Sequence, residues 1–207
     1  MTTEVLPLDP DVPAPDILER AARVLKDGGV VAFPTETFYG LAAAALDARA
    51  VRRVFETKGR PESKPLLLLV DSVAMVDTVA VDVSGRARQL MARHWPGPLT
   101  LVLAASPAVP AEVTGGTGTV GVRLSPHPAA TGLVSALGGP ITAPSANPSG
   151  APPPTTAADV LRGLEGKIAL VLDAGPTRGG PPSTVLDLTV DPPRVVRPGA
   201  VDVGTMT

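Results

Sequence analysis

The sequence predicts an α/β fold in which helices cover a mixed β-sheet. Short apolar runs typical of strands alternate with segments of helical period along the whole chain, without an internal repeat. Residues 66–70 are apolar at every position, as expected for a strand that is covered on both faces. Several connections between predicted strands are too short for a crossover helix, so some neighbouring strands must be antiparallel.

The composition is that of a globular chain with a substantial core. Of the 207 residues, 44% are hydrophobic, 18% are charged and only 2% are aromatic, so Val, Leu and Ala must build the core. This length suffices for one large domain or two small ones. Because no boundary interrupts the alternation of elements, we predict a single domain over residues 1–207. Its core is expected at about residues 15–200, and residues 1–13 are expected to form an extended arm.

Charge, cysteine content and hydropathy exclude several classes of protein. The formal net charge of −2 argues against non-specific nucleic-acid binding through bulk charge. A chain without cysteine has no disulfides, zinc–thiolate sites, Fe–S clusters or cysteine nucleophiles. The first residues are not basic and lead into no long apolar run, and no stretch approaches the roughly 20 apolar residues of a membrane span. We therefore expect a cytoplasmic protein without a membrane segment.

Six segments combine a helical period of apolar residues with suitable ends. In the first, Pro15 and Asp16 suit the opening turn and Gly28 suits the stop. In the second, Asp47 can cap a helix that has an apolar inner face and three outward arginines. The predicted helices span residues 16–26, 47–57, 72–80, 84–94, 128–137 and 157–164.

The predicted strands are short apolar runs bounded by proline, glycine or polar residues. Pro34 cannot donate to a sheet ladder, so the first buried strand should stop there. Residues 119–124 alternate valine with glycine and arginine, as a strand with one polar face would. An edge strand is expected near residues 5–6, and residues 105–118 are expected to be a loop. The other predicted strands span residues 30–33, 41–46, 66–70, 99–104, 119–124, 140–143, 168–172, 185–188 and 195–196.

A polar segment follows the first buried strand, with the sequence Pro34-Thr35-Glu36-Thr37-Phe38-Tyr39-Gly40. In an open α/β sheet, ligands bind beyond the carboxyl ends of strands. Two hydroxyls, a carboxylate and a phenol at such a place suggest a small polar ligand. The alternative is a tight turn whose threonines satisfy local backbone groups. The segment alone leaves both interpretations open.

Three cations lie within seven residues, between the second helix and the strand that follows it: Lys58, Arg60 and Lys64. They could form a phosphate clamp, in which arginine offers a planar fork and lysine a point charge. They could equally be a solvated basic turn that complements a helix end. We expect Lys58 and Arg60 to lie on an exposed turn.

Two further groups of residues suggest a binding site. Ser145 and Asn147 follow a short predicted strand and could hold phosphate oxygens, although an Asx-type turn is the alternative. Arg123 lies on an otherwise apolar strand, where a charge is costly unless it is paired or contacts a ligand. Arg197, before Pro-Gly, raises the same question. Cations and hydroxyls at element ends, without a nucleophile or a convincing base, favour catalysis by positioning and charge neutralisation of a phosphorylated ligand.

Other motifs carry little weight. Residues 116–121 match G-x-G-x-x-G, but they run into a strand rather than a helix, which excludes the dinucleotide-binding fingerprint. There is no Walker A sequence. His94 and His127 lack acidic neighbours at metal-binding spacing, so we interpret them as part of a corner beside Trp95 and as a helix start.

Six motifs in order and spacing resemble the YrdC/YciO-like threonylcarbamoyl-AMP synthases over roughly residues 15–200. They are Pro34-Thr35-Glu36-Thr37-Phe38-Tyr39-Gly40-Leu41, Lys58-Gly59-Arg60-Pro61, Trp95-Pro96-Gly97-Pro98-Leu99-Thr100, Ala143-Pro144-Ser145-Ala146-Asn147-Pro148-Ser149-Gly150, Pro182-Ser183-Thr184-Val185 and Arg197-Pro198-Gly199. The resemblance implies an open twisted sheet around a concave, positively charged cleft. It also implies that L-threonine, bicarbonate and ATP are joined into threonylcarbamoyl-adenylate with release of pyrophosphate, a nucleotidyl transfer that serves the t6A modification of tRNA adenosine 37.

The resemblance also implies roles for single residues. The catalytic residues would be Lys58, Arg60, Ser145 and Asn147. The ATP site would comprise Lys58, Arg60, Lys64, Thr119, Ser145, Asn147 and Arg197. L-Threonine would be bound by Thr35, Arg123, Ala143 and Ser183. Mg²⁺ is expected to accompany ATP without a dedicated metal site on the protein, and proteins that transfer the threonylcarbamoyl group to tRNA are the expected downstream partners.

The chain departs from the family's pattern at two points. Some longer members carry a threonine-contacting histidine where this chain has Leu69, and they have an extra carboxyl-terminal domain after the Arg197-Pro198-Gly199 motif. The chain therefore resembles a minimal form, in which its own loops or a partner would close the cleft. Two alternatives stay open: a non-catalytic RNA-binding protein of the YciO kind, which the scarcity of aromatic residues for base stacking disfavours, and an enzyme that carbamoylates or adenylates another acceptor. Direct contact with tRNA is also left open.

Overall fold

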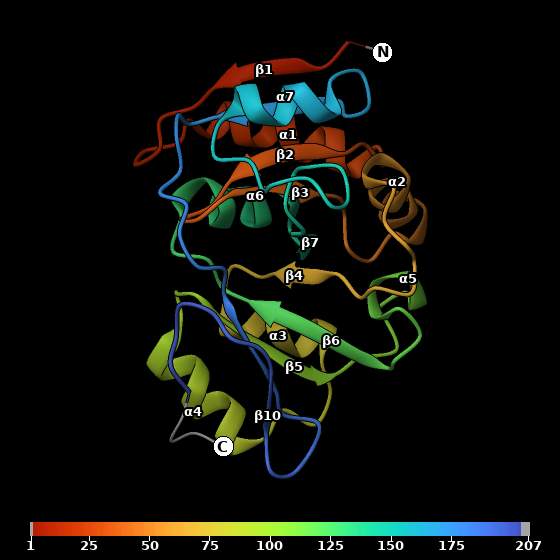
Figure 1. Cartoon of the computed structure of the whole chain (residues 1–207), viewed down its shortest axis with the longest axis vertical. Helices are drawn as coiled ribbons and strands as arrows, with labels where there is room; N and C mark the ends of the chain where they lie inside the picture. The colour runs from red at the N-terminus through yellow and green to blue at the C-terminus, as the bar shows by residue number, and fades with distance from the viewer. Residues whose placement is uncertain (1, 204–207) are drawn as a thin grey trace.

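The structure is a computed structural model that describes residues 2–203. Its strands form two mixed sheets that lie one above the other along the long axis of the molecule (Figure 1). The upper sheet has the order β1-β8-β2-β3 and the lower sheet has the order β10-β9-β5-β6-β4-β7. Both sheets contain parallel and antiparallel pairs, which confirms the prediction of a mixed α/β architecture.

The strands are short, as their sequence pattern predicted. They are β1 (Glu4–Pro7), β2 (Val31–Pro34), β3 (Tyr39–Ala42), β4 (Leu67–Leu69), β5 (Leu99–Ala104), β6 (Thr119–Arg123), β7 (Ile141–Thr142), β8 (Leu170–Asp173), β9 (Thr184–Asp187) and β10 (Arg194–Arg197). β2 ends at Pro34, as expected. β3, however, begins at Tyr39 and not at residue 41, because the β2–β3 turn is tight enough for Tyr39 to pair with Pro34.

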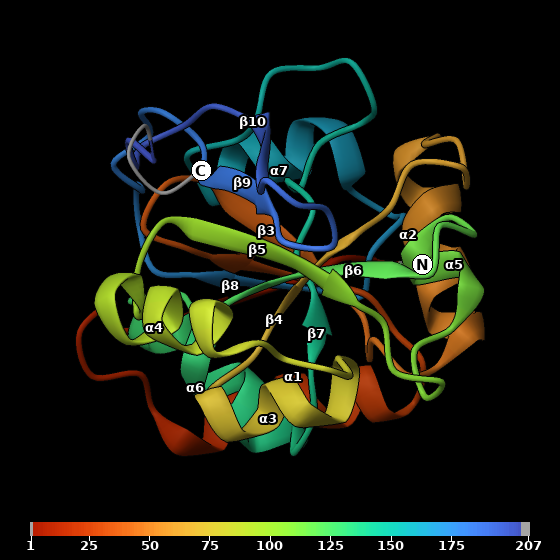
Figure 2. The same cartoon turned by 90° about the horizontal axis from the view of Figure 1, so that it is seen from below.

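The helices flank the sheets (Figure 2). They are α1 (Pro15–Lys26), α2 (Ala48–Lys58), α3 (Val73–Val79), α4 (Gly85–His94), α5 (Ala111–Thr114), α6 (Pro128–Leu137) and α7 (Ala157–Leu164). Asp47 caps α2 as predicted, since its carboxylate accepts the backbone N–H of Arg49 at 2.9 Å. The four-residue helix α5, beside α2, was missed because its segment contains too few residues to show a period.

The short strand β7 joins the two sheets. It pairs with β4 in the lower sheet, and it also forms a bridge between Ile141 and Ala44, just beyond β3 in the upper sheet (Figure 1). The hydroxyl of Thr142 donates to the carbonyl of Leu41 at 2.9 Å and accepts the N–H of Ala43 at 2.9 Å. Two sheet edges that would otherwise be unpaired therefore meet along one seam.

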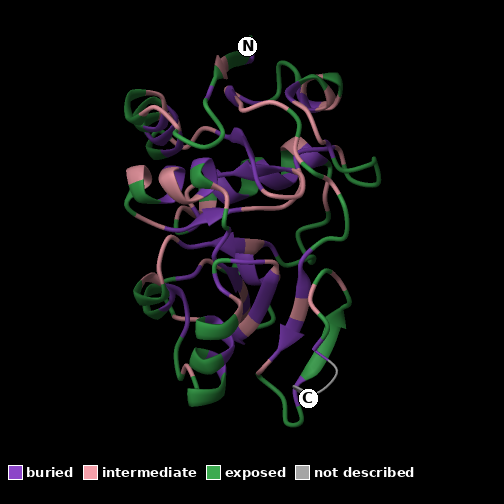
Figure 3. Ribbon diagram, turned by 90° about the vertical axis from the view of Figure 1, so that its left-hand side faces the viewer, coloured by how far each residue is buried: buried purple, intermediate pink, exposed green. Residues whose placement is uncertain are grey.

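The core lies between the sheets and their helices, and it is built mainly from Val, Leu and Ala as the composition predicted. Both sheets are largely buried except at two edge strands: β10 is exposed along its whole length and β1 along most of its length (Figure 3). α1 and α6 pack together over β2. Within residues 2–203, no helix combines the length and the apolar character that crossing a membrane requires.

Candidate functional site

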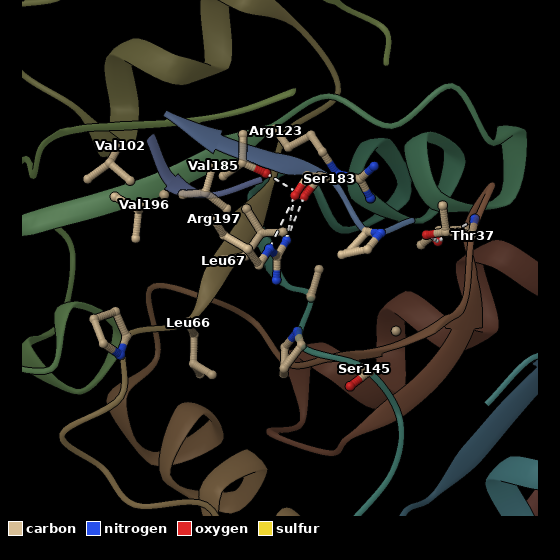
Figure 4. A pocket seen from close by; sticks show the side chains of 18 of the residues that line it. Thr37, Leu66, Leu67, Val102, Arg123, Ser145, Ser183, Val185, Val196 and Arg197 are labelled. Atoms are coloured by element: carbon tan, nitrogen blue, oxygen red, sulfur yellow. Dashed lines mark hydrogen bonds between the residues drawn. The ribbon is translucent and has the colours of Figure 1, made fainter. Parts of the chain in front are cut away.

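A cavity of about 700 Å³ lies where the two sheets meet, and it brings together residues from distant parts of the sequence (Figure 4). Many of the predicted site residues line it: Thr35, Arg60, Thr119, Arg123, Ala143, Ser145, Ser183 and Arg197. Lys58, Lys64 and Asn147 are not among the lining residues. The geometry thus gathers most of the predicted site into one hollow, while the role of each residue remains a prediction.

The β2–β3 turn forms one wall of the cavity. The hydroxyl of Thr35 donates to the carbonyl of Phe38 at 2.7 Å and accepts the backbone N–H groups of Thr37 and Phe38, each at 3.3 Å. Thr35 therefore satisfies local backbone groups, as the tight-turn interpretation required. Thr35 and Thr37 also line the cavity, so the two interpretations of this segment are compatible.

Arg123 reaches the cavity from β6 in the lower sheet. It is only 4% exposed, and its Nη1 forms an ion pair with Glu36 of the β2–β3 turn in the upper sheet. The hydroxyl of Ser125 donates to the other oxygen of Glu36 at 2.8 Å. Burial works to raise the pKa of Glu36, but the charge of Arg123 and the bond from Ser125 outweigh it, so the pKa lies below its ordinary value. The pair bridges the two sheets behind the cavity.

The ion pair does not use all of the Arg123 guanidinium. Its Nε is buried and has no hydrogen-bond partner among residues 2–203. A buried donor without a partner costs about 1–3 kcal/mol, more when it is charged. Arg197 lies close enough for the charge of Arg123, after burial, to help lower the pKa of Arg197. Two neighbouring arginines, one with a free buried donor, form a site suited to an anion.

Arg197 is held against the segment that precedes β9. Its Nη2 donates to the carbonyl oxygen of Ser183 at 2.8 Å and to the Ser183 hydroxyl at 3.0 Å (Figure 4). The same hydroxyl lies 2.9 Å from the hydroxyl of Thr100 on β5. At Gly199, an added Cβ would lie 2.2 Å from the carbonyl oxygen of Pro182, so only glycine lets the chain after β10 pass this close. Thr100 was not predicted as a site residue.

Arg60 and Ser145 line the cavity at another side. Arg60 is half-buried, and its Nη2 donates to the carbonyl of Pro65 at 3.0 Å, which closes the basic turn just before β4. Lys64, in the same turn, is exposed and lies outside the lining. The structure therefore supports a cavity-facing role for Arg60 and gives no contact that would support one for Lys64.

Lys58 does not lie on an exposed turn, and that expectation is wrong. It is the last residue of α2 and is 4% exposed. Its ammonium group donates to the carbonyl of Asn147 at 2.6 Å and to the carbonyl of Ser145. The physical reason is visible in the sequence, because Lys58 continues the buried stripe of Val51, Val54 and Phe55 at helical spacing. Burial, followed by the charge of Arg60, lowers the pKa of Lys58 to about 8.

Asn147 shapes the same loop. Its amide Nδ2 donates to the carbonyls of Pro148 and Ala151 at 2.9 Å and 2.7 Å. Its Oδ1 is buried without a partner in the part of the chain that the structure describes. No Asx-type turn forms among the described residues, because Oδ1 accepts no backbone N–H and only Nδ2 bonds the loop. Lys58 and Asn147 together hold the loop that presents Ser145 to the cavity.

The two histidines lie outside the cavity lining. His127 begins α6 as predicted, since its Nδ1 accepts the backbone N–H of Ala129 at 3.2 Å. His94 ends α4 next to Trp95, whose indole N–H donates to the carbonyl of Leu99 at 2.7 Å. Burial lowers the pKa of both imidazoles, which favours their neutral forms.

Sequence reasoning also missed an apolar wall of the cavity. Val102, Val185 and Val196 lie together at one side, opposite Thr37 and Ser145 (Figure 4). Beside them, Asp187 of β9 accepts a hydrogen bond from Arg194 of β10 at 3.2 Å. These residues read as ordinary strand positions in the sequence, and only the pairing of three strands brings them to one place.

Comparison with known proteins identifies the relatives of this chain. The family described as "Telomere recombination" (Sua5/YciO/YrdC) matches residues 23–199. The threonylcarbamoyl-AMP synthase of Pyrococcus abyssi is 49% identical over 87% of this chain and 53% of its own length, and that of Bacillus subtilis is 42% identical over 97% and 57%. A putative threonylcarbamoyl-AMP synthase of Mycobacterium tuberculosis is 38% identical over 87% of this chain and 83% of its own length.

Solved structures share the fold. The crystal structure of P. abyssi Sua5 complexed with L-threonine matches with a TM-score of 0.94 and 44% identity, over 99% of this chain and 60% of that one. The crystal structure of E. coli YciO matches with a TM-score of 0.88 and 28% identity, over 98% of each chain. This chain thus spans little more than half the length of the first two synthases, 53% and 57%.

Proposed function

The chain belongs to the Sua5/YciO/YrdC family, and from this membership and its cavity we propose that it is a threonylcarbamoyl-AMP synthase. It would join L-threonine, bicarbonate and ATP into threonylcarbamoyl-adenylate and release pyrophosphate. The names of its relatives and the L-threonine complex of P. abyssi Sua5 support this choice. The observation that carries it is the buried Nε of Arg123, which has no hydrogen-bond partner among residues 2–203, beside a cavity that Arg60 and Arg197 also line.

The end of the cavity beside the β2–β3 turn suits an amino acid. A guanidinium binds a carboxylate through two parallel N–H groups, and the Nε side of Arg123 is not used by Glu36. We place the threonine carboxylate there. The hydroxyls of Thr35 and Ser183 and the backbone at Ala143 line the same hollow and would complete the threonine site.

The remaining cations suit the phosphates of ATP. Arg60, Arg197, Thr119 and Ser145 line the cavity and would contact the nucleotide directly. Lys58 and Asn147 would act behind it, by holding the loop of Ser145. Within residues 2–203, no group of three or more His, Cys, Asp or Glu side chains could hold a metal. Mg²⁺ prefers phosphate oxygens and water, so it would arrive with ATP.

The proposed chemistry needs positioning more than a nucleophilic side chain. The amine of threonine becomes a carbamate, either by attacking CO₂ and releasing a proton or by attacking the carbon of bicarbonate, whose C–O bond breaks as water leaves. A carbamate oxygen then attacks the α-phosphorus of ATP as the bond to pyrophosphate breaks, which is a nucleotidyl transfer. Both reactants are anions, so arginines that hold them together lower the barrier by orientation and charge neutralisation.

The product would supply the t6A modification of tRNA. Threonylcarbamoyl-adenylate is a mixed anhydride, so a protein that transfers its acyl group to tRNA must follow. We propose that the chain forms this product in the cytoplasm. Direct contact of this chain with tRNA is part of what the experiment below distinguishes.

The test is pyrophosphate release by the purified chain with Mg²⁺-ATP, threonine and bicarbonate, omitting one at a time. We expect release only with all three. Arg123→Gln should lose this threonine-dependent release, whereas Arg49→Gln, which changes an exposed arginine on α2, should keep it. Equal release without threonine would contradict the proposal. Release with another amino acid in its place would indicate a different acceptor, and tRNA binding without ATP turnover would favour the RNA-binding alternative.

A further inference from the structure

Three polar side chains form a hydrogen-bonded chain along one wall of the cavity. The hydroxyl of Thr100 lies 2.9 Å from the hydroxyl of Ser183. The Ser183 hydroxyl accepts a hydrogen bond from Arg197 Nη2 at 3.0 Å (Figure 4). Thr100 is on β5, Ser183 directly precedes β9, and Arg197 ends β10. These three strands are neighbours in the lower sheet, so the row of hydrogen-bonded side chains runs across that sheet.

The residues of this hydrogen-bonded row face different substrates in the proposed reaction. Ser183 belongs to the threonine end and Arg197 to the ATP end. Arg197 uses its Nε and Nη2 on Ser183, with the carbonyl oxygen at 3.2 Å and 2.8 Å. This leaves Nη1 for a phosphate. Ser183 therefore orients the arginine and does not compete with the nucleotide for it.

The hydroxyl of Ser183 has one hydrogen and accepts two hydrogen bonds. Arg197 occupies one acceptor position. If Ser183 gives its hydrogen to Thr100, it has none for a substrate. If Thr100 is the donor instead, the hydrogen of Ser183 is free to point into the cavity. The observed distance is compatible with either direction.

Thr100 is well placed to act either as donor or as acceptor in its hydrogen bond to Ser183. It is 2% exposed and lies on a strand whose other residues are Leu, Val and Ala. A buried hydroxyl among apolar neighbours is costly unless it is hydrogen-bonded. Its bond to Ser183, together with its place in the cavity lining, gives the hydroxyl a function that valine, of nearly the same shape, could not provide.

We propose that Thr100 is a positioning residue that couples the threonine and ATP ends of the cavity by reversing the direction of its hydrogen bond to Ser183. The inference rests on the proposed function. When threonine binds, Ser183 donates to an oxygen of the amino acid, and Thr100 donates to Ser183. The bond from Arg197 to Ser183 is kept. Because bonds in such a chain polarise one another, each substrate strengthens the binding of the other, and by linkage the effect is reciprocal.

The test is calorimetric titration of threonine into the full chain, with and without a non-hydrolysable ATP analogue and Mg²⁺. We expect the analogue to tighten threonine binding in the wild type and in Thr100→Ser, which keeps the hydroxyl, by about 5-fold or more. In Thr100→Val the ratio of the two dissociation constants should fall to near one. Thr114→Val is the matched control, since Thr114 is a buried threonine outside the cavity lining that bonds only local backbone.

A double-mutant cycle tests the route through Ser183. Adding Thr100→Val to Ser183→Ala should not change the ratio of the two threonine dissociation constants further, because Thr100 acts only through Ser183. If Thr100→Val does not fold by circular dichroism, Thr100→Ala takes its place. A Thr100 variant without a hydroxyl that keeps the wild-type ratio would overturn the inference, as would a wild type that shows no coupling. Both results leave the proposed function standing, whereas a wild type without threonine-dependent pyrophosphate release would remove the function itself.

Discussion

The burial of Lys58 has a measurable consequence for stability. We consider Lys58→Met, which keeps the length of the side chain but removes the charge and the bonds to the carbonyls of Ser145 and Asn147. In the folded chain the pKa of Lys58 is lowered from 10.5 to about 8. Between these values the unfolded chain binds a proton that the folded chain does not, so the free energy of unfolding rises with pH across this window.

The size of the effect follows from the shift. Below pH 8 the buried charge costs about 3 kcal/mol relative to its fully neutral form, at about 1.4 kcal/mol for each pKa unit. This is an upper limit, because the two carbonyls favour the ammonium form and offset part of the cost. Lys58→Met has no ammonium group at this position to titrate. The difference in the free energy of unfolding, wild type minus Lys58→Met, should therefore grow by about 1–3 kcal/mol between pH 7.5 and pH 10.

Urea unfolding of both proteins at the two pH values measures this difference. The exposed lysine of α1 provides the control, since Lys26→Met should show a difference from the wild type that does not change with pH. Burial raises the pKa of Tyr39, so Tyr39 lowers the free energy of unfolding with rising pH, but only above pH 10 and therefore outside the range compared. If the advantage of the wild type over Lys58→Met is the same at pH 7.5 and pH 10, the assignment of Lys58 as a buried cation is wrong.

Three further predictions concern the site and its supports. Glu36→Gln removes the charge that orients the arginine of β6, so KM for threonine in the pyrophosphate assay should rise about 10-fold, a loss of about 1.4 kcal/mol, with kcat and KM for ATP nearly unchanged; equal changes in both KM values would contradict this role. Arg60→Ala should weaken ATP binding in a calorimetric titration by about 10-fold or more, whereas Lys64→Ala should change it less than about 3-fold. Equal losses of affinity in the two variants would contradict the assignment of Arg60, and not Lys64, to the phosphate site. Gly199→Ala forces a Cβ to within 2.2 Å of a backbone carbonyl and should cost about 2 kcal/mol or more in thermal unfolding, while Gly139→Ala, with nothing within 4 Å of its Cβ, should be nearly neutral; similar melting temperatures for the two would refute the steric argument.

Much of the fold could be predicted because its elements carry local signals. The helix caps at Asp47 and His127, the apolar period of α1 and the proline that ends β2 each act within a few residues. The mixed character of the sheets followed from short connections. The pairing of β7 with both sheets could not be predicted, since a two-residue strand carries no period and its partners are about 70 and 100 residues away.

Most residues that the family resemblance supplied line the cavity, but Lys58, Lys64 and Asn147 do not, and the role of each stays a prediction. The helix was predicted to end at residue 57, which put Lys58 on an exposed turn. The structure extends α2 to Lys58, and burial is possible there because two backbone carbonyls accept hydrogen bonds from the ammonium. Thr100 looked like an ordinary strand residue. Its importance depends on Ser183, which lies 83 residues away in the sequence and 2.9 Å away in space.

The strand β7 has a consequence for how substrates can be accommodated. The cavity takes one wall from the upper sheet and another from the lower. The two residues of β7, which include Thr142 and its hydroxyl, connect the sheets, as does the ion pair of Arg123 and Glu36. A tilt of one sheet against the other at this seam would change the width of the cavity. In the proposed reaction, the distance between amino acid and nucleotide would then depend on both sheets together.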